Sequence, residues 1–220
     1  NLIDKRSNGG AIYANFVGNT HNCYIFNCTI EACKVTKDRA NGGAIRIGIS
    51  NPTSRVEITK CTIIGNSATY GGGIYFSGVH GLVSECIFLN NIATGGDGGD
   101  FYFYCNDNQN SKEVVLIQNC KFTRDDQDTA TSIVYFQWMP VSDFSFKGNE
   151  VKINVEGVTA FNSNPITLGP QSSLVCENNL INSKNLVFPN ELSDSDMGRI
   201  LSKGFSVIPD TENPDKPPPS

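Results

Sequence analysis

A phrase of two glycines and an aliphatic residue recurs along the chain about every thirty residues. It reads NGGAIYANF at residues 8–16, NGGAIRIGI at 41–49 and YGGGIYFSG at 70–78, with a further glycine pair at Gly98. By subtraction, the pairs at Gly9, Gly42, Gly71 and Gly98 lie 33, 29 and 27 residues apart. A unit this short cannot bury an apolar face alone, whereas stacked copies share one continuous core. The repeat therefore restricts the chain to a solenoid-like architecture.

A second phrase, centred on a cysteine, recurs between the glycine pairs. It reads FNCTIEAC (26–33), TKCTIIGN (59–66), SECIFLNN (84–91) and QNCKFTRD (118–125). Two weaker copies continue the central column, which becomes Cys28, Cys61, Cys86, Cys120, Asn149 and Asn179. Three residues before it stand Ile25, Ile58, Val83, Ile117, Phe146 and Cys176. Two residues after it stand Ile30, Ile63, Phe88, Phe122, Val151 and Ile181. Six copies with the same apolar columns indicate a repeated structural unit.

Each copy contains short segments of alternating polarity, such as AIYANF and VEITKCTI, separated by Gly/Asn turns. Equivalent strands of stacked copies lie ~4.8 Å apart and form parallel sheets. We therefore predict an all-β fold, a right-handed parallel β-helix of six to seven coils, with the handedness of crossover connections. A β-propeller is disfavoured because its blades need about 40 residues and antiparallel hairpins.

The glycine pairs are expected where the chain turns into a strand, since glycine adopts backbone angles that side chains obstruct. Alternation after each pair then predicts one inward and one outward column. The inward column is Ile12, Ile45 and Ile74, and the outward column is Tyr13, Arg46 and Tyr75.

The domain prediction is a β-helix over residues 1–191, a capping segment over 192–208 and a proline-rich tail or linker over 209–220. The segment SDSDMGRILSKGF (193–205) departs from the repeat, and Ser193 or Ser195 is suited to begin a short helix. Such a cap would cover strand edges that otherwise invite pairing. The tail PDTENPDKPPPS is typical of polyproline-like segments. No comparable cap precedes Gly9, so further coils or a neighbouring molecule are expected there.

The GGAIY-type phrase, together with IIGN (63–66) and FLNN (88–91), resembles the repeats of polymorphic outer-membrane proteins. These are known from chlamydiae, and related repeats occur in surface proteins of parasitic protists. The resemblance covers residues 8–185 and weakens after Thr131, where TSIVYF replaces the glycine pair. It implies a right-handed β-helix displayed at a cell surface, often with an adhesive role, and it carries no catalytic residue across.

Composition excludes several classes of function. The net charge is -5 and 18% of residues are charged, which provides no basic surface for nucleic acid. No apolar run approaches the ~20 residues of a membrane span. The even number of cysteines, eight, favours an oxidising location. We expect an extracellular or cell-surface protein whose partners are proteins, including further copies of itself, and glycans. The sequon Asn27-Cys28-Thr29 makes Asn27 a candidate glycosylation site.

The cysteine and asparagine column is predicted to form an interior ladder. Its thiols are either free and stacked, or joined as disulfides between coils; parallel Cβ atoms favour free thiols. No metal or cofactor is expected, since no CxxC pair is present and a linear stack is not tetrahedral. The stretch GGDGGDFYF (95–103) fits a calcium-binding nonapeptide once, but those sites need consecutive copies.

Two groups of residues compete as the functional site. An outward stripe of Tyr13, Arg46, Tyr75 and Tyr102 is the predicted binding site, with cross-strand stacking as the alternative role. Two acidic groups support a polysaccharide lyase or glycoside hydrolase instead: Asp97 with Asp100, and Asp125 with Asp126 and Asp128. Because neither His21 nor His80 stands in a catalytic motif, we predict no enzyme. The predicted function is a non-catalytic structural or adhesive module of an extracellular surface protein or filament.

Overall fold

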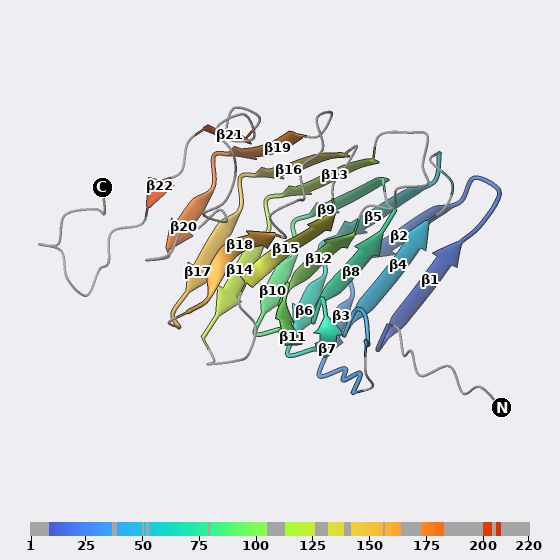
Figure 1. Ribbon diagram of the computed structural model, residues 1–220, viewed down its shortest axis with the longest axis horizontal. Coiled ribbons are helices and arrows are strands. Elements are labelled where there is room, and N and C mark those ends of the chain that lie inside the picture. The colour runs from blue at the N-terminus through green and yellow to red at the C-terminus, as the bar shows by residue number, and fades with distance from the viewer. Residues whose placement is uncertain are drawn as a thin grey trace, which may run out of the picture.

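The structure is a computed structural model. It describes residues 9–36, 39–49, 51, 53–78, 80–104, 113–125, 132–138, 142–155, 157–163, 173–182, 200–203 and 206–207. In these ranges every regular element is a β-strand, and no helix is present that could cross a membrane. The strands stack in parallel as a β-helix, with the N-terminal coil at one end and the C-terminal strands at the other (Figure 1).

Three parallel sheets run the length of the stack. Sheet I consists of β1 (Ile12–Phe16), β4 (Ile45–Ile49), β8 (Ile74–Ser77), β12 (Phe101–Tyr104), β15 (Ser132–Trp138) and β18 (Thr159–Ser163). Sheet II consists of β2 (Asn22–Phe26), β5 (Arg55–Thr59), β9 (His80–Ser84), β13 (Glu113–Gln118), β16 (Ser142–Lys147), β19 (Ser173–Glu177) and β21 (Ile200–Lys203). Sheet III consists of β3 (Thr29–Glu31), β6 (Thr62–Ile64), β10 (Ile87–Leu89), β14 (Lys121–Arg124), β17 (Glu150–Ile153), β20 (Leu180–Asn182) and β22 (Ser206–Val207).

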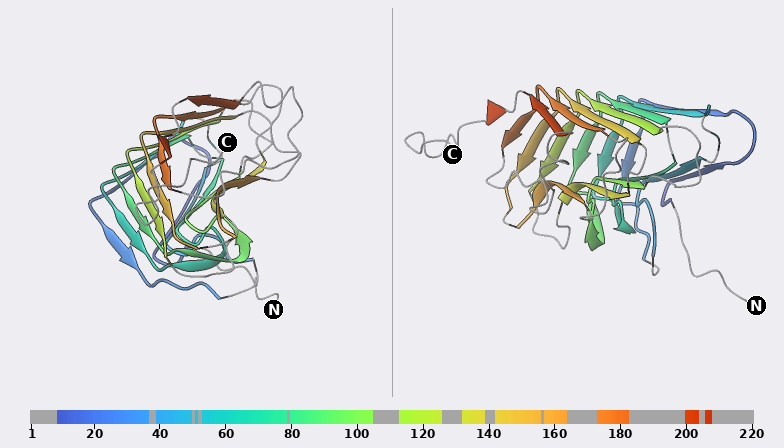
Figure 2. Two further views of the ribbon diagram at one scale, coloured as in Figure 1. Left: turned by 90° about the vertical axis from the view of Figure 1, so that its left-hand side faces the viewer. Right: turned by 45° about the horizontal axis from the view of Figure 1, so that its top comes forward.

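Each coil visits the three sheets in the same order, so equivalent strands lie one behind another when the molecule is viewed along the stack (Figure 2, left). The chain makes about five turns, slightly fewer than the six to seven predicted. A short two-stranded sheet of β7 (Ser67–Tyr70) and β11 (Ile92–Asp97) follows sheet III in two central coils. This small sheet lies beside sheet I, and the repeat pattern alone did not indicate it.

The apolar columns read from the sequence are the inner faces of sheets II and III. Ile58 pairs with Val83, and Ile63 with Phe88, so the predicted register is confirmed. Phe88 and Phe122 stack with ring centroids 4.7 Å apart and are fully buried. Aromatic rings stacked in this way stabilise the core beyond the area they bury.

Each glycine pair meets two separate steric requirements. Gly42 has a φ of 71°, in the left-handed region that favours glycine. A Cβ on Gly43 would lie 2.1 Å from the carbonyl oxygen of Gly72 in the next coil. The first glycine therefore makes the turn, and the second allows neighbouring coils to approach.

The corner between sheets II and III is made by one residue with positive φ in each coil. The φ values lie between 52° and 62° for Asn27, Lys60, Glu85, Asn119, Gly148 and Asn178. Asparagine and glycine tolerate this conformation best, which explains their frequency at this position.

Two short strands continue the stack at the C-terminal end of the described residues. Strand β21 pairs with β19, and β22 pairs with β20, so residues 200–203 and 206–207 extend sheets II and III. The helix expected to begin at Ser193 or Ser195, and the tail over 209–220, lie outside the described residues.

Candidate binding site

The outward column of sheet I forms a continuous stack of side chains. Residues Tyr13, Arg46, Tyr75, Tyr102 and Tyr135 pair in register from β1 to β15, and we refer to them as the tyrosine ladder. The rings of Tyr75 and Tyr102 lie 5.0 Å apart at 12°, and those of Tyr102 and Tyr135 lie 5.0 Å apart at 28°. The Arg46 guanidinium lies between two rings, 5.2 Å from Tyr13 and 5.7 Å from Tyr75. Cation–π and ring stacking thus continue from one end of the ladder to the other.

The predicted exposure of this column is wrong for two of its members. Tyr13 is 52% exposed, whereas Tyr75 is 8% exposed and Tyr102 only 3%. Tyr102 lies between the rings of Tyr75 and Tyr135. Tyr75 lies between the Tyr102 ring and the Arg46 guanidinium, so both tyrosines lose exposure to their in-register neighbours. Tyr70 of β7 also packs against Tyr102, with centroids 5.4 Å apart at 55°.

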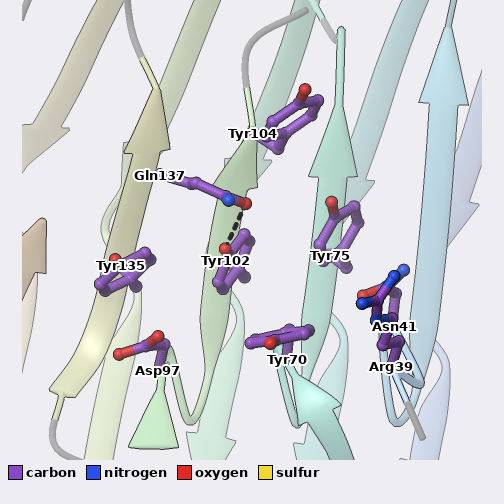
Figure 3. A pocket seen from close by; sticks show the side chains of 9 residues that line it. All are labelled: Arg39, Asn41, Tyr70, Tyr75, Asp97, Tyr102, Tyr104, Tyr135 and Gln137. Carbon is purple, nitrogen blue, oxygen red and sulfur yellow. Dashed lines mark hydrogen bonds between the residues drawn. The ribbon is translucent and has the colours of Figure 1, made fainter. Parts of the chain in front are cut away.

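A pocket of about 390 Å³ opens over the ladder, and we call it the tyrosine pocket. It is lined by Arg39, Asn41, Tyr70, Tyr75, Asp97, Tyr102, Tyr104, Tyr135 and Gln137. Tyr75, Tyr102 and Tyr135 form one row across β8, β12 and β15 (Figure 3). Asp97 and Tyr70 lie at the ends of β11 and β7 on one side of this row, and Gln137 and Tyr104 lie on the other.

The polar groups of the pocket are largely uncharged. Burial raises the pKa of Tyr75 to about 12, and burial together with the Asp97 carboxylate raises that of Tyr135 to about 12. The pKa of Tyr102 is raised further by burial, and its hydroxyl donates a hydrogen bond to Gln137 Oε1. Burial also raises the pKa of Asp97. The phenols of Tyr75, Tyr102 and Tyr135 therefore stay protonated near neutral pH and can both donate and accept hydrogen bonds.

The acidic residues of the catalytic alternative do not converge in the part of the chain that the structure describes. Asp97 lines the pocket, whereas Asp100 is completely buried inside the coil and accepts a hydrogen bond from Asn91 Nδ2 at 2.7 Å. Asp125 is exposed and bonds Asn154, while Asp126 and Asp128 lie outside the described residues. No group of three or more potential metal ligands occurs among the described side chains, the GGDGGDFYF stretch included.

The cysteine and asparagine column lies on the inner side of the corner between sheets II and III, and we call it the inner ladder. Five of its six members are about 1% exposed: Cys61, Cys86, Cys120, Asn149 and Asn179. Four backbone N–H groups of the column, those of Cys61, Cys86, Cys120 and Asn149, each bond the side chain one coil further on. Cys86 N–H donates to Cys120 Sγ at 3.4 Å, and Cys120 N–H to Asn149 Oδ1 at 2.9 Å. Thiol and amide occupy the same column because both accept this hydrogen bond.

Every described cysteine is a free thiol; Cys105 lies outside the described residues. Burial raises the pKa of Cys176 to about 12 and raises that of Cys120 even more strongly. Cys28, at the first coil, is exposed. Hydrogen bonding with Cys120 lowers the pKa of the neighbouring Cys86 thiol. Cys61, Cys86 and Cys120 are each about 1% exposed, so reagents do not reach them, which indicates a structural role for the inner ladder.

The candidate glycosylation residue lies at an accessible corner. Asn27 is exposed, has a φ of 52° and uses its backbone N–H to bond the Thr59 carbonyl. Its side chain points away from the inward Cys28 position, so a glycan there would extend from the outside of the first coil.

Sequence reasoning did not find most of the pocket. Tyr135 was detectable, because it occupies in TSIVYF the place that Tyr102 holds in the preceding coil. Tyr70, Tyr104 and Gln137 carry no such signal. They reach the pocket from strand β7 and from positions two residues beyond the ladder.

No family model, curated protein or solved structure matches this chain. The fold and the site define it as a parallel β-helix with a tyrosine-lined pocket on the outer face of one sheet. The resemblance to polymorphic outer-membrane proteins stays a prediction from the GGAIY-type phrases.

Proposed function

We propose that this chain is a non-catalytic structural and adhesive β-helix module that binds partners through the tyrosine pocket. The observation that carries this proposal is a pocket over three stacked rings, Tyr75, Tyr102 and Tyr135, whose hydrogen-bonding groups are neutral except for Arg39 and Asp97. Pockets with aromatic linings and a few convergent polar groups are typical binding sites.

The scaffold supports a binding role because the site is preorganised. Tyr102 is held between two rings, and Tyr75 between the Tyr102 ring and the Arg46 guanidinium, so both lose little further conformational freedom when a ligand binds. Glycoside cleavage by the usual route needs two carboxyl groups that flank one bond. Among the described residues, Asp97 is the one carboxylate that lines the pocket, and Asp100 is buried away from it.

The rest of the proposal concerns the setting of the protein. We place the chain outside the cell or at a cell surface, as a module of a surface protein or filament. The exposed corner at Asn27 is compatible with a glycan in such a compartment.

The test is binding of the intact, fluorescently labelled chain to a panel of cell surfaces and extracellular-matrix preparations. We expect Asp97→Asn and Gln137→Ala to reduce binding at least about tenfold, the effect of removing one well-placed hydrogen-bond partner. Glu31→Gln and Gln118→Ala make the same chemical changes outside the pocket and should leave binding unchanged. Equal binding by all four variants would refute the pocket as the adhesive site.

A second candidate function, end-on assembly with a further copy, is favoured by the first coil. Strands β1, β2 and β3 each stand at the end of their sheet. Around them, four large apolar side chains are more than half exposed: Tyr13, Val17, Tyr24 and Phe26. Unpaired strand edges beside apolar side chains template pairing with another chain. Sedimentation velocity should show concentration-dependent association that Tyr24→Ser with Phe26→Ser abolishes; a monomer at all concentrations would exclude this assembly.

A further inference from the structure

We infer that the tyrosine pocket binds a linear, neutral oligosaccharide whose chain lies along the axis of the β-helix. This inference rests on the proposed function, since it names the chemical class of the ligand that the same pocket takes. It follows from three properties of the pocket: its repeat along the axis, the chemistry of its hydrogen-bonding groups and its distribution of charge.

The pocket repeats along the helix axis on both of its sides. On one side the rings of Tyr75, Tyr102 and Tyr135 are spaced 5.0 Å apart, ring to ring. On the other side Tyr70 pairs with Asn41 in the preceding coil and with Asp97 in the following one. A ligand that repeats with this spacing meets equivalent groups at each step. One pyranose unit of an extended sugar chain is about as long as one such step, whereas an extended peptide advances only ~3.3 Å per residue.

The hydrogen-bonding groups suit a ligand that carries many hydroxyls. Neutral phenols donate and accept, the amides of Asn41 and Gln137 do both, and the Asp97 carboxylate accepts from two adjacent hydroxyls. An apolar ligand would displace water from the Asp97 carboxylate and the hydroxyls of Tyr70 and Tyr104 without replacing its hydrogen bonds, which costs about 1–3 kcal/mol for each such group. A polyhydroxylated ligand can form hydrogen bonds with them both as a donor and as an acceptor.

Two rings that lie outside the stack provide the apolar part of the site. Tyr70 is tilted by 55° to Tyr102, and both Tyr70 and Tyr104 are partly exposed at the pocket. The C–H face of a pyranose ring packs on such aromatic surfaces, while its equatorial hydroxyls reach the polar groups beside them.

The distribution of charge selects a neutral sugar. Asp97 lies near Tyr102 and Tyr135, and its field contributes to the raised pKa of both phenols. Arg39 lies with Asn41 at the opposite end of the pocket, beside Tyr75 (Figure 3). A polyuronate lying along the axis would place repeated carboxylates beside Asp97 and meet the Arg39 cation at one end only.

The experiment is isothermal titration of the intact chain with cello-oligosaccharides of two to six units and with chitotetraose. Tetragalacturonate and a synthetic PDTENPDKPPPS peptide represent the acidic sugar and the proline-rich ligand. We expect a neutral series to bind, with affinity rising at least about tenfold from the disaccharide to the tetrasaccharide and then levelling off, because the row of rings in the pocket, Tyr75, Tyr102 and Tyr135, spans three coils. Asp97→Asn and Gln137→Ala should each weaken binding about tenfold, while Glu31→Gln and Gln118→Ala should not. Circular dichroism of each variant establishes that the fold is retained.

Binding of the peptide or the polyuronate in place of neutral sugars would overturn the inference. So would sugar binding that is indifferent to Asp97→Asn and Gln137→Ala. If no sugar binds while attachment to surfaces still depends on Asp97 and Gln137, the sugar inference fails and the proposed function stands. If neither depends on these residues, both fail.

Discussion

The inner ladder and the tyrosine ladder are both columns of one residue per coil, yet they are stabilised by different interactions. In the inner ladder four backbone N–H groups bond the side chain of the next coil, as Cys120 does with Asn149. In the tyrosine ladder the side chains contact one another directly, as Tyr75 and Tyr102 do at 5.0 Å. One column satisfies backbone polar groups inside the coil, and the other packs rings outside it.

This difference explains which substitutions the repeat has accepted. Cysteine gives way to asparagine between Cys120 and Asn149 because both side chains accept the same N–H. In the tyrosine ladder, Arg46 stands between Tyr13 and Tyr75 because a planar cation can stack on rings as another ring would. The inner ladder thus accepts residues whose side chains can accept a hydrogen bond, and the tyrosine ladder accepts residues whose side chains are planar.

Tyr102→Ala should lower the free energy of unfolding the most, because it removes a central ring of the tyrosine ladder. Removing a 3%-exposed ring that contacts rings on both sides should cost about 4 kcal/mol in the free energy of unfolding. Tyr102→Phe loses only the hydrogen bond to Gln137 and should cost about 1 kcal/mol or less. Urea unfolding followed by circular dichroism measures both. Equal losses for the two variants would mean that the hydroxyl, rather than the ring, stabilises the ladder.

Asn149→Ala breaks the inner ladder with a slightly smaller effect. It leaves the buried Cys120 N–H unpaired and removes the bonds that Asn149 Nδ2 donates to Ile117 O and Asn179 Oδ1. We expect a loss of about 3 kcal/mol in the free energy of unfolding. Asn149→Cys restores the acceptor found in the preceding coils and should recover at least half of that loss. A cysteine variant no more stable than the alanine variant would show that the two side chains are not interchangeable.

The pH dependence of stability tests the buried carboxyl group of Asp100, which accepts a hydrogen bond from Asn91 inside the coil. Burial raises the pKa of Asp100 from 3.8 to about 6, although the nearby Arg124 cation opposes the shift. A raised carboxyl pKa means that the folded state binds the proton more tightly than the unfolded state does. The protonated Asp100 carboxyl therefore contributes fully to the free energy of unfolding below about pH 4, and this contribution is lost as the pH rises through about 6.

The difference in unfolding free energy between wild type and Asp100→Asn should change by no more than about 3 kcal/mol from pH 4 to 7. Asp125→Asn alters an exposed carboxyl and serves as the control. A difference that is constant across this range would contradict a shifted pKa at Asp100.

Thiol labelling tests the inner ladder without any substitution, so we expect no change in stability and only a difference in labelling rate between cysteines. Cys28 is exposed, whereas Cys61, Cys86 and Cys120 are 1% exposed and form the inner ladder. Brief treatment of the native chain with iodoacetamide, followed by peptide mass spectrometry, should modify Cys28 well before the three buried thiols. Urea should make all four react. Comparable native rates would show that the ladder opens readily.

The β-helix itself was predictable because its evidence is periodic. The apolar columns recur in six copies and the glycine pairs, with the alternation after them, in the first four, so several weak signals agree on one register. The observed pairing of Ile58 with Val83 and of Ile63 with Phe88 follows that register. The additional β7–β11 sheet was missed because only two coils contribute to it.

The site was harder to predict because its members come from different parts of the coil. Tyr75 and Tyr102 were expected to be exposed, since alternation gives the direction of a side chain and not what covers it. Asp97 and Asp100 are three residues apart, yet Asp97 lines the pocket and Asp100 is buried within the coil. The turn at Gly98 and Gly99 lies between them, so the chain passes from the pocket at Asp97 to the interior of the coil at Asp100.

The sequence by itself determined the repeat, the register and which residues share a column, because each of these depends on spacing along the chain. Only the tertiary structure decided that the outward tyrosines stack into a buried ladder, that the thiols stay free and that Tyr70, Asp97 and Gln137 meet at one pocket. The reason is physical: a column is fixed by local alternation, whereas burial and contact depend on the side chains that neighbouring coils bring within about 5 Å of it.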